Sequence, residues 1–180
     1  MHSIRNARAG VKLLRSVMVS MAVLAGFAAA ADLPQVGEQA PEFSLPSQEG
    51  ETPVSLKQFR GKWVVLYFYP KDMTQGCTIE AHNFQQDLSK YDRVNAVIVG
   101  VSVDSTDSHK VFCAKESLTF RLLADAEKTV VDRYGSLNTH GIASRNTFLI
   151  DPAGKISKVW TAVNPSKHSQ EVLGALAETK

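Results

Sequence analysis

The chain has very few cysteines, and it lacks the sequence motifs that usually hold phosphates, nucleotides or metals. Cysteine occurs only as Cys77 and Cys113 among 180 residues, and no Cys-x-x-Cys pair is formed. We find no glycine-rich phosphate loop, no dinucleotide fingerprint and no haem motif. These absences argue against nucleotide and haem chemistry, so no cofactor is expected. The two single thiols therefore become the groups to explain.

The N-terminus has the three parts of a secretory signal peptide. A basic head is followed by an apolar stretch over residues 17–27 and then by a run of alanines. The apolar stretch is about half as long as the roughly 20 residues that span a bilayer. We therefore expect a signal peptide over residues 1–31, cleaved near Ala30 or Ala31, and a single domain over residues 32–180. The mature protein is expected in a bacterial periplasm without membrane attachment, and an uncleaved N-terminal anchor is the alternative.

Most of the basic excess of the chain belongs to that N-terminal segment. The whole sequence has 20 Lys and Arg against 18 Asp and Glu, and residues 1–31 hold four of the basic residues and none of the acidic ones. The remainder carries 16 basic against 18 acidic residues, so its formal charge is −2 and no nucleic-acid partner is expected. A domain of about 150 residues buries roughly 70% of its unfolded surface. It does not need a disulfide to fold, which makes its cysteines better candidates for chemistry.

Hydrophobic periodicity predicts strands and helices that alternate along residues 32–180. Residues 63–69 are a continuous apolar run, which is typical of a strand buried on both faces. From Gly76 onward, apolar residues recur at helical spacing. The remaining elements are expected as an N-terminal β-hairpin over 41–56, strands at 96–103 and within 120–125, a helix capped by Asp104 and Ser105, a short helix over 128–135, a hairpin over 146–160 and a last helix over 166–180. This order predicts an α/β, thioredoxin-like sandwich with a mixed central sheet flanked by helices.

Cys77 lies where the buried strand gives way to a helix, directly after Gly76. The first backbone N–H groups of a helix have no intrahelical partner, and they favour a thiolate at that place. The hydroxyl of Thr74 can hydrogen-bond at the same turn, and Pro70 can shield the site. The three residues form a Pro-x-x-x-Thr-x-x-Cys pattern that indicates a nucleophilic cysteine. An inert, half-buried cysteine at the start of a helix is the alternative.

Three segments of the sequence, together with this motif, resemble a known family: residues 64–84, 145–156 and 167–176. Residues 34–178 are similar to a peroxiredoxin, more closely to the bacterioferritin comigratory protein or peroxiredoxin Q subfamily. The resemblance implies a thiol peroxidase that reduces hydrogen peroxide and organic hydroperoxides. It also implies thioredoxin as the electron donor, or a thioredoxin-like protein if the enzyme is periplasmic. A monomer is expected.

The resemblance assigns roles to four residues. Cys77 would attack a peroxide oxygen and become a sulfenic acid, Thr74 and Arg145 would hold the peroxide oxygens, and Pro70 would shield the thiolate. The residues support Arg145 independently, because it opens a strand expected beside the end of the buried one and its charge is fixed. A solvated arginine at a strand end is the alternative. Glu80 is expected to be an ordinary acid of the first helical turn, or else to orient a cation.

The usual subfamily pattern has a second cysteine five residues after the first, and this chain has His82 there. We expect His82 to be a surface residue of the helix. Some members of the subfamily place their resolving cysteine on the following helix, so the resemblance implies that Cys113 can resolve Cys77. The alternative is a core cysteine beside Phe112, which would make the protein a one-cysteine peroxidase.

Three other functions compete with the peroxidase. A thiol–disulfide oxidoreductase of the thioredoxin fold would need Cys-x-x-Cys at the start of the helix, which is absent here. A non-enzymatic domain would use the two cysteines as a structural disulfide. A metal site would combine the two cysteines with His82 and His109, but these spacings match no standard zinc pattern.

Overall fold

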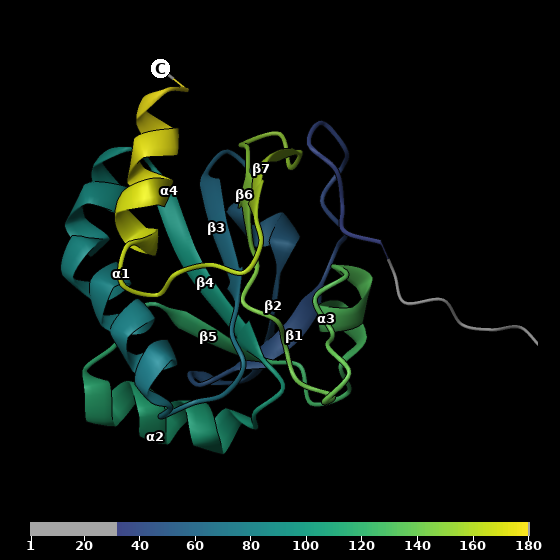
Figure 1. Cartoon of the computed structure of the whole chain (residues 1–180), viewed down its shortest axis with the longest axis vertical. Coiled ribbons are helices and arrows are strands. Elements are labelled where there is room, and N and C mark those ends of the chain that lie inside the picture. Colours follow the sequence, from purple (N-terminus) through teal and green to yellow (C-terminus); the bar gives the residue numbers. More distant parts are fainter. Residues whose placement is uncertain (1–31, 180) are drawn as a thin grey trace, which may run out of the picture.

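A seven-stranded mixed sheet forms the centre of the molecule (Figure 1). The computed structural model describes residues 32–179 apart from the Glu51 side chain, so the expected signal peptide lies outside the described residues. The strands are β1 (Ser44–Ser47), β2 (Gly50–Ser55), β3 (Trp63–Phe68), β4 (Ala96–Ser102), β5 (Arg121–Ala124), β6 (Thr147–Ile150) and β7 (Ile156–Trp160). They lie in the order β2-β1-β5-β4-β3-β6-β7, in which β3, β4 and β5 are parallel and the other pairs are antiparallel.

Helices cover both faces of this sheet. They are η1 (Leu56–Phe59), α1 (Gln75–Arg93), α2 (Thr106–Glu116), α3 (Thr129–Arg133) and α4 (His168–Ala177). Figure 1 shows α1, α2 and α4 on one side of the sheet and α3 on the other. The predicted α/β, thioredoxin-like sandwich with its N-terminal hairpin β1–β2 is therefore confirmed.

The apolar run of β3 supplies both halves of the core. Alternate side chains of a strand point to opposite faces, and Leu66 and Phe68 accordingly join the cluster under α3 while Val65 and Tyr67 join the cluster under α1, α2 and α4. All four are at most 1% exposed. A strand with two buried faces has no place for alternating polar residues, which is why the sequence shows none here.

The topology gathers three chain segments at one edge of the sheet. The parallel strands β3 and β4 end there, each followed by the loop that leads to its helix. Strand β6 is antiparallel to β3, with Tyr67 opposite Thr147, so it begins at the same edge. The N–H of Phe68 donates to the carbonyl of Asn146 at 2.8 Å. Arg145 is thereby placed next to the segment that leads from β3 to α1.

Helix boundaries differ slightly from the expected ones. Helix α1 begins at Gln75 with Thr74 as its N-cap, so Cys77 is its third residue rather than its first or second. At the start of α2, the Ser105 side chain accepts from the N–H of Ser108 at 3.2 Å. Asp104 does not cap that helix, because its carboxylate accepts from neighbouring groups outside the helix.

A polar clamp joins the C-terminal half of α1 to α4. The carboxylate of Asp87 accepts from the Ser169 hydroxyl at 2.7 Å and from the Gln170 amide at 2.6 Å. One turn later, the Tyr91 hydroxyl donates to the carbonyl of Ser169 at 2.8 Å. These bonds are largely buried, so they fix this end of α1 against its neighbour.

None of the helices within residues 32–179 has both the length and the apolar character that a membrane crossing would require.

Candidate active site

Cys77 and Arg145 meet at the edge of the sheet where β3 ends and β6 begins. Cys77 is 2% exposed, and Arg145 donates from Nη2 to its Sγ at 3.4 Å. The two residues are 68 positions apart in the sequence, and the antiparallel pairing of β3 and β6 brings them together. A fixed positive charge and the unpaired N–H groups of the first turn of α1 both favour negative charge on the sulfur.

Glu80 completes this cluster: the expectation of an ordinary first-turn acid is wrong, and the alternative, an acid that orients a cation, is what the structure shows. It is 1% exposed and forms an ion pair with Nη1 of Arg145. Burial raises the pKa of Glu80 to about 7, and Arg145 opposes that rise. The spacing from Cys77 is three residues, which puts both side chains on one face of α1. One guanidinium therefore bridges the thiol and the carboxylate.

Gly76 makes room for that guanidinium. A Cβ atom at this position would lie 3.3 Å from Nη2 of Arg145 and 3.6 Å from Cγ of Pro165. The backbone of Gly76 does not have a positive φ, so its small size, rather than its flexibility, is what the site uses. Sequence reasoning did not give this residue a role, although a glycine directly before the candidate nucleophile was a usable signal.

Thr74 and Pro70 shape the loop before α1. Thr74 is exposed, and its hydroxyl donates to the carbonyl of Lys71 at 3.0 Å, which closes the turn before the helix. Pro70 is half-buried directly after Tyr69. Among the described residues, no hydrogen bond joins Thr74 to Cys77, so the structure brings Cys77 and Arg145 into contact but leaves the threonine hydroxyl turned to its own loop.

Cys113 lies on α2, 8% exposed, beside Phe112 in the core cluster that also contains Cys77. Both thiols are free. Burial raises the pKa of Cys113 to about 11, and the charges of Asp72 and Glu49 add to the rise. The folded state therefore keeps this thiol protonated and unreactive.

His82, which stands where the subfamily pattern has its second cysteine, lies on the outside of α1. Its side chain is 44% exposed, and its Nε2 lies 2.9 Å from a carboxylate oxygen of Glu116 on α2. This agrees with the expected surface position. Within residues 32–179, no group of three or more His, Cys, Asp or Glu side chains is placed to hold a metal ion.

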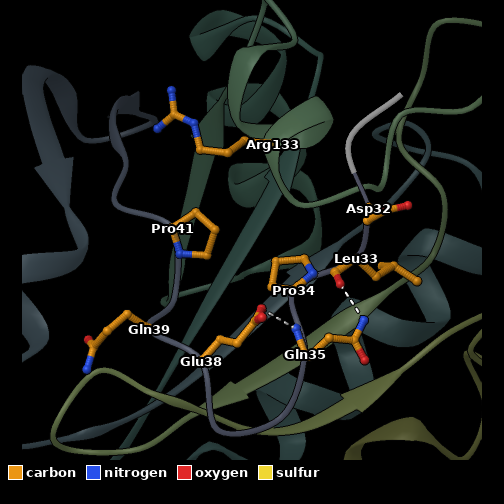
Figure 2. A pocket seen from close by; sticks show the side chains of 8 residues that line it. All are labelled: Asp32, Leu33, Pro34, Gln35, Glu38, Gln39, Pro41 and Arg133. Carbon is orange, nitrogen blue, oxygen red and sulfur yellow. Dashed lines mark hydrogen bonds between the residues drawn. The ribbon is translucent and has the colours of Figure 1, made fainter. Parts of the chain in front are cut away.

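A hollow of about 620 Å³ lies away from the thiols, between residues 32–41 and Arg133 (Figure 2). Figure 2 shows Glu38 accepting from the backbone N–H of Gln35 along its rim. Neither cysteine lines it. The chemistry suggested by Cys77 and Arg145 concerns a small oxygen-containing group rather than a large ligand, so it does not depend on a cavity of this size.

Residues 36–159 match the model of the AhpC/TSA family, and they include Pro70, Thr74, Cys77, Cys113 and Arg145. The chain belongs to this family of thiol peroxidases. The match covers more than half of the sequence and spans the whole thiol site.

Relatives place it within the peroxiredoxins of the Bcp and Q type. Peroxiredoxin Bcp of Bacillus subtilis is 40% identical over 152 residues, which is 80% of this chain and 96% of the relative. Chloroplastic peroxiredoxin Q of Sedum lineare is 40% identical over 147 residues, which is 80% of this chain and 78% of the relative. The comparisons give no support to a thiol–disulfide oxidoreductase.

Solved structures agree with this placement. A Cys-to-Ser mutant of PrxQ from Xylella fastidiosa superposes with a TM-score of 0.78 at 31% identity and covers 83% of this chain and all of its own. The bacterioferritin comigratory protein of Xanthomonas campestris superposes with a TM-score of 0.75 at 32% identity and covers 81% of this chain and 99% of its own. The fold and the family therefore agree.

Proposed function

We propose that Cys77 is the peroxidatic residue of an enzyme that reduces hydrogen peroxide and organic hydroperoxides. The observation that carries the proposal is the contact of 3.4 Å between Sγ of Cys77 and Nη2 of Arg145 at the start of α1. The guanidinium holds a thiolate and, through its planar set of N–H donors, the peroxide oxygens beside it. The Xanthomonas campestris bacterioferritin comigratory protein has alkyl peroxide reduction activity, which supports the substrate class.

The first step transfers one oxygen atom to the sulfur. The thiolate of Cys77 attacks the nearer peroxide oxygen, the O–O bond breaks, and the other oxygen leaves as water or an alcohol after it takes a proton. Cys77 becomes a sulfenic acid, and the peroxide is reduced by two electrons. Arg145 stabilises the charge that moves from sulfur to the leaving oxygen, while Pro70 limits the access of water and Thr74 keeps the loop closed.

The second step forms a disulfide with Cys113. The Cys113 thiol attacks the sulfenic sulfur, an S–S bond forms, and water is released. Two solved structures of peroxiredoxin Q from Xanthomonas campestris carry single Cys-to-Ser substitutions 36 positions apart, which is the separation of Cys77 and Cys113. Cys77 contacts Arg145, and Cys113 lies on the buried face of α2. We therefore expect the start of α1 and part of α2 to open locally before the sulfurs meet, at a cost far below that of global unfolding.

A dithiol of the thioredoxin type then reduces the disulfide and restores both thiols. In a periplasmic protein a thioredoxin-like reductant would take this part, because thioredoxin itself is cytosolic. The composition of residues 1–31 supports a signal peptide and periplasmic export, and the proposed mature enzyme is a monomer that begins near Asp32. N-terminal sequencing of protein from periplasmic and cytosolic fractions of the host tests the location, and an intact N-terminus in the cytosol would contradict it.

The test of function is mass spectrometry of each variant after one equivalent of peroxide. Cys77→Ser should consume peroxide at least about a thousandfold more slowly than wild type, because the nucleophile is gone. Cys113→Ser should still reduce the first equivalent, then accumulate sulfenic and sulfinic acid instead of the disulfide. Peroxide consumption by Cys77→Ser above a few per cent of the wild-type rate would refute the assignment of Cys77. A free Cys113 or a disulfide-linked dimer in oxidised wild type would refute its resolving role.

A further inference from the structure

A buried polar cluster ties the loop before α1 to helix α2. Asp72, in that loop, accepts at Oδ2 from His109 Nδ1 at 2.8 Å and from the Ser108 hydroxyl at 2.7 Å. Its other oxygen, Oδ1, accepts from the Tyr69 hydroxyl at 2.7 Å. Asp72 is 4% exposed and His109 is fully buried. Neither residue takes part in the proposed peroxide chemistry, so the cluster needs another explanation.

The cluster connects the two segments that carry the thiol chemistry. Asp72 lies between Pro70 and Thr74, in the loop that leads into α1, and the first turn of α1 contains Cys77. His109 lies four residues, about one helical turn, before Cys113 on the same face of α2. Bonds within this cluster therefore hold both segments in their folded positions, and each segment is proposed to open locally before the disulfide forms.

Helix α2 depends on this anchor more than the longer helix α1 does. It has 11 residues, and its buried residues are His109, Phe112 and Cys113. A helix of this length is marginal in water without packing. When Cys113 leaves the core, His109 and Phe112 are the buried residues that still hold α2 against the sheet, and His109 is the polar one of the two. Its Nε2 has no hydrogen-bond partner in the described part of the chain, so the ring is held on its Nδ1 side.

The bonds to Asp72 are charge-assisted. Burial acts to raise the pKa of Asp72, but the hydrogen bonds from His109, Ser108 and Tyr69 outweigh it and leave the pKa lowered. The carboxylate is therefore ionised at neutral pH, and hydrogen bonds to an ionised acceptor are stronger than those between neutral groups.

We propose that the cluster of Asp72, His109, Ser108 and Tyr69 is a latch that keeps α2 wound, and that its opening sets the rate at which Cys113 reaches the sulfenic acid of Cys77. The proposal rests on the resolving role of Cys113 given above. The latch decides between two fates of the sulfenic acid. Attack by Cys113 gives the disulfide and water, whereas a second peroxide molecule transfers another oxygen, gives the sulfinic acid and leaves as water or an alcohol.

Ser108→Ala tests the latch with little risk to folding, because Asp72 keeps its bonds to His109 and Tyr69. The matched control is Ser169→Ala, which removes a hydroxyl–carboxylate bond of the same length, 2.7 Å, from the clamp between α1 and α4. Rapid mixing with peroxide, acid quenching and mass spectrometry separate the two steps. Ser108→Ala should form the disulfide about threefold to tenfold faster, the factor that one hydrogen bond supplies. Formation of the sulfenic acid should stay within about twofold of wild type, and Ser169→Ala should change neither rate.

Amide hydrogen exchange of the reduced protein gives a second readout without any chemistry. Residues 112 and 113 should exchange faster in Ser108→Ala than in wild type by a similar factor, while α4 stays protected. Equal rates of disulfide formation in Ser108→Ala, Ser169→Ala and wild type would overturn the latch and leave the resolving role of Cys113 intact. No disulfide between Cys77 and Cys113 in wild type would overturn both.

Discussion

The two thiols of this enzyme are buried in the same core cluster, but their charged neighbours differ. Cys77 contacts the guanidinium of Arg145 at the start of α1. Cys113 lies in the C-terminal half of α2, where burial and the carboxylates of Asp72 and Glu49 raise its pKa to about 11. Burial alone therefore does not distinguish the two thiols. The contact with Arg145 and the position in the helix do, and they are the basis for the different roles proposed for the two residues.

Alkylation of the reduced protein is the strongest test of this contrast. At pH 7, iodoacetamide should modify Cys77 at least about a hundredfold faster than Cys113, because the thiolate is the reacting species and Cys113 is almost entirely protonated. Peptide mass spectrometry over time measures both rates. Exposure alone predicts the opposite order, since Cys113 is 8% exposed and Cys77 is 2% exposed.

The control for that experiment is the same reaction in concentrated guanidinium chloride, where both thiols are solvated. Their rates should then agree within a few-fold. Faster labelling of Cys113 in the folded protein would remove the electrostatic distinction between the two sites.

Arg145→Lys is expected to slow the reaction of Cys77 with peroxide. An ammonium group is a point charge and cannot bridge the thiol, Glu80 and a peroxide as the planar guanidinium does. The rate constant for sulfenic acid formation should fall by about tenfold to a hundredfold. Arg121→Lys is the matched control, because Arg121 pairs with Glu49 at 3.1 Å on the surface. Equal rates in the two variants would return Arg145 to a structural role.

Glu80→Gln should give the smallest effect, seen in the pH dependence of stability. The folded-state pKa of Glu80, about 7, lies above its ordinary value of 4.5, so the native state binds more protons between these values. Stability from this group is therefore present below about pH 4.5 and is lost as the pH rises through 7, by on the order of 1–3 kcal/mol.

The measurement is urea unfolding of both proteins from pH 4.5 to 8. His168 complicates the wild-type curve, because burial lowers its pKa to about 4 and its contribution runs the other way over part of this range. The difference between Glu80→Gln and wild type isolates Glu80. A difference that does not change with pH would mean that Glu80 has the same protonation state in the folded and unfolded protein.

Much of the fold could be predicted because its signals are local. The apolar run of β3, the helical spacing after Gly76 and the turn at residues 151–154 each lie within one short segment, and all three are confirmed. The start of α1 was placed one or two residues late, because the Thr74 side chain does not cap the helix in the usual way and so gives no clear boundary signal.

The site was predictable only in part, since its contacts join distant positions. The buried role of Glu80 depends on Arg145, 65 residues later in the chain, and Asp72 and His109 are 37 positions apart. Neither pairing leaves a local pattern in the sequence. Arg145 was recognised through a motif, whereas Asp72 occupies an unspecified position of the Pro-x-x-x-Thr-x-x-Cys pattern and His109 was considered only as a metal ligand. The catalytic and resolving roles themselves stay predictions until the variants are measured.

The clamp that fixes Asp87 and Tyr91 of α1 to α4 has a consequence for repeated turnover. Forming a helix from coil requires a costly nucleus, but extending an existing helix adds one hydrogen bond for each residue fixed. If α1 unwinds at the end that contains Cys77, the end bonded to α4 stays helical, and the unwound turns can re-form on it. Rewinding is then propagation without nucleation, which takes on the order of nanoseconds per residue. The helix can thus lose and regain its first turns many times while its far end stays in place.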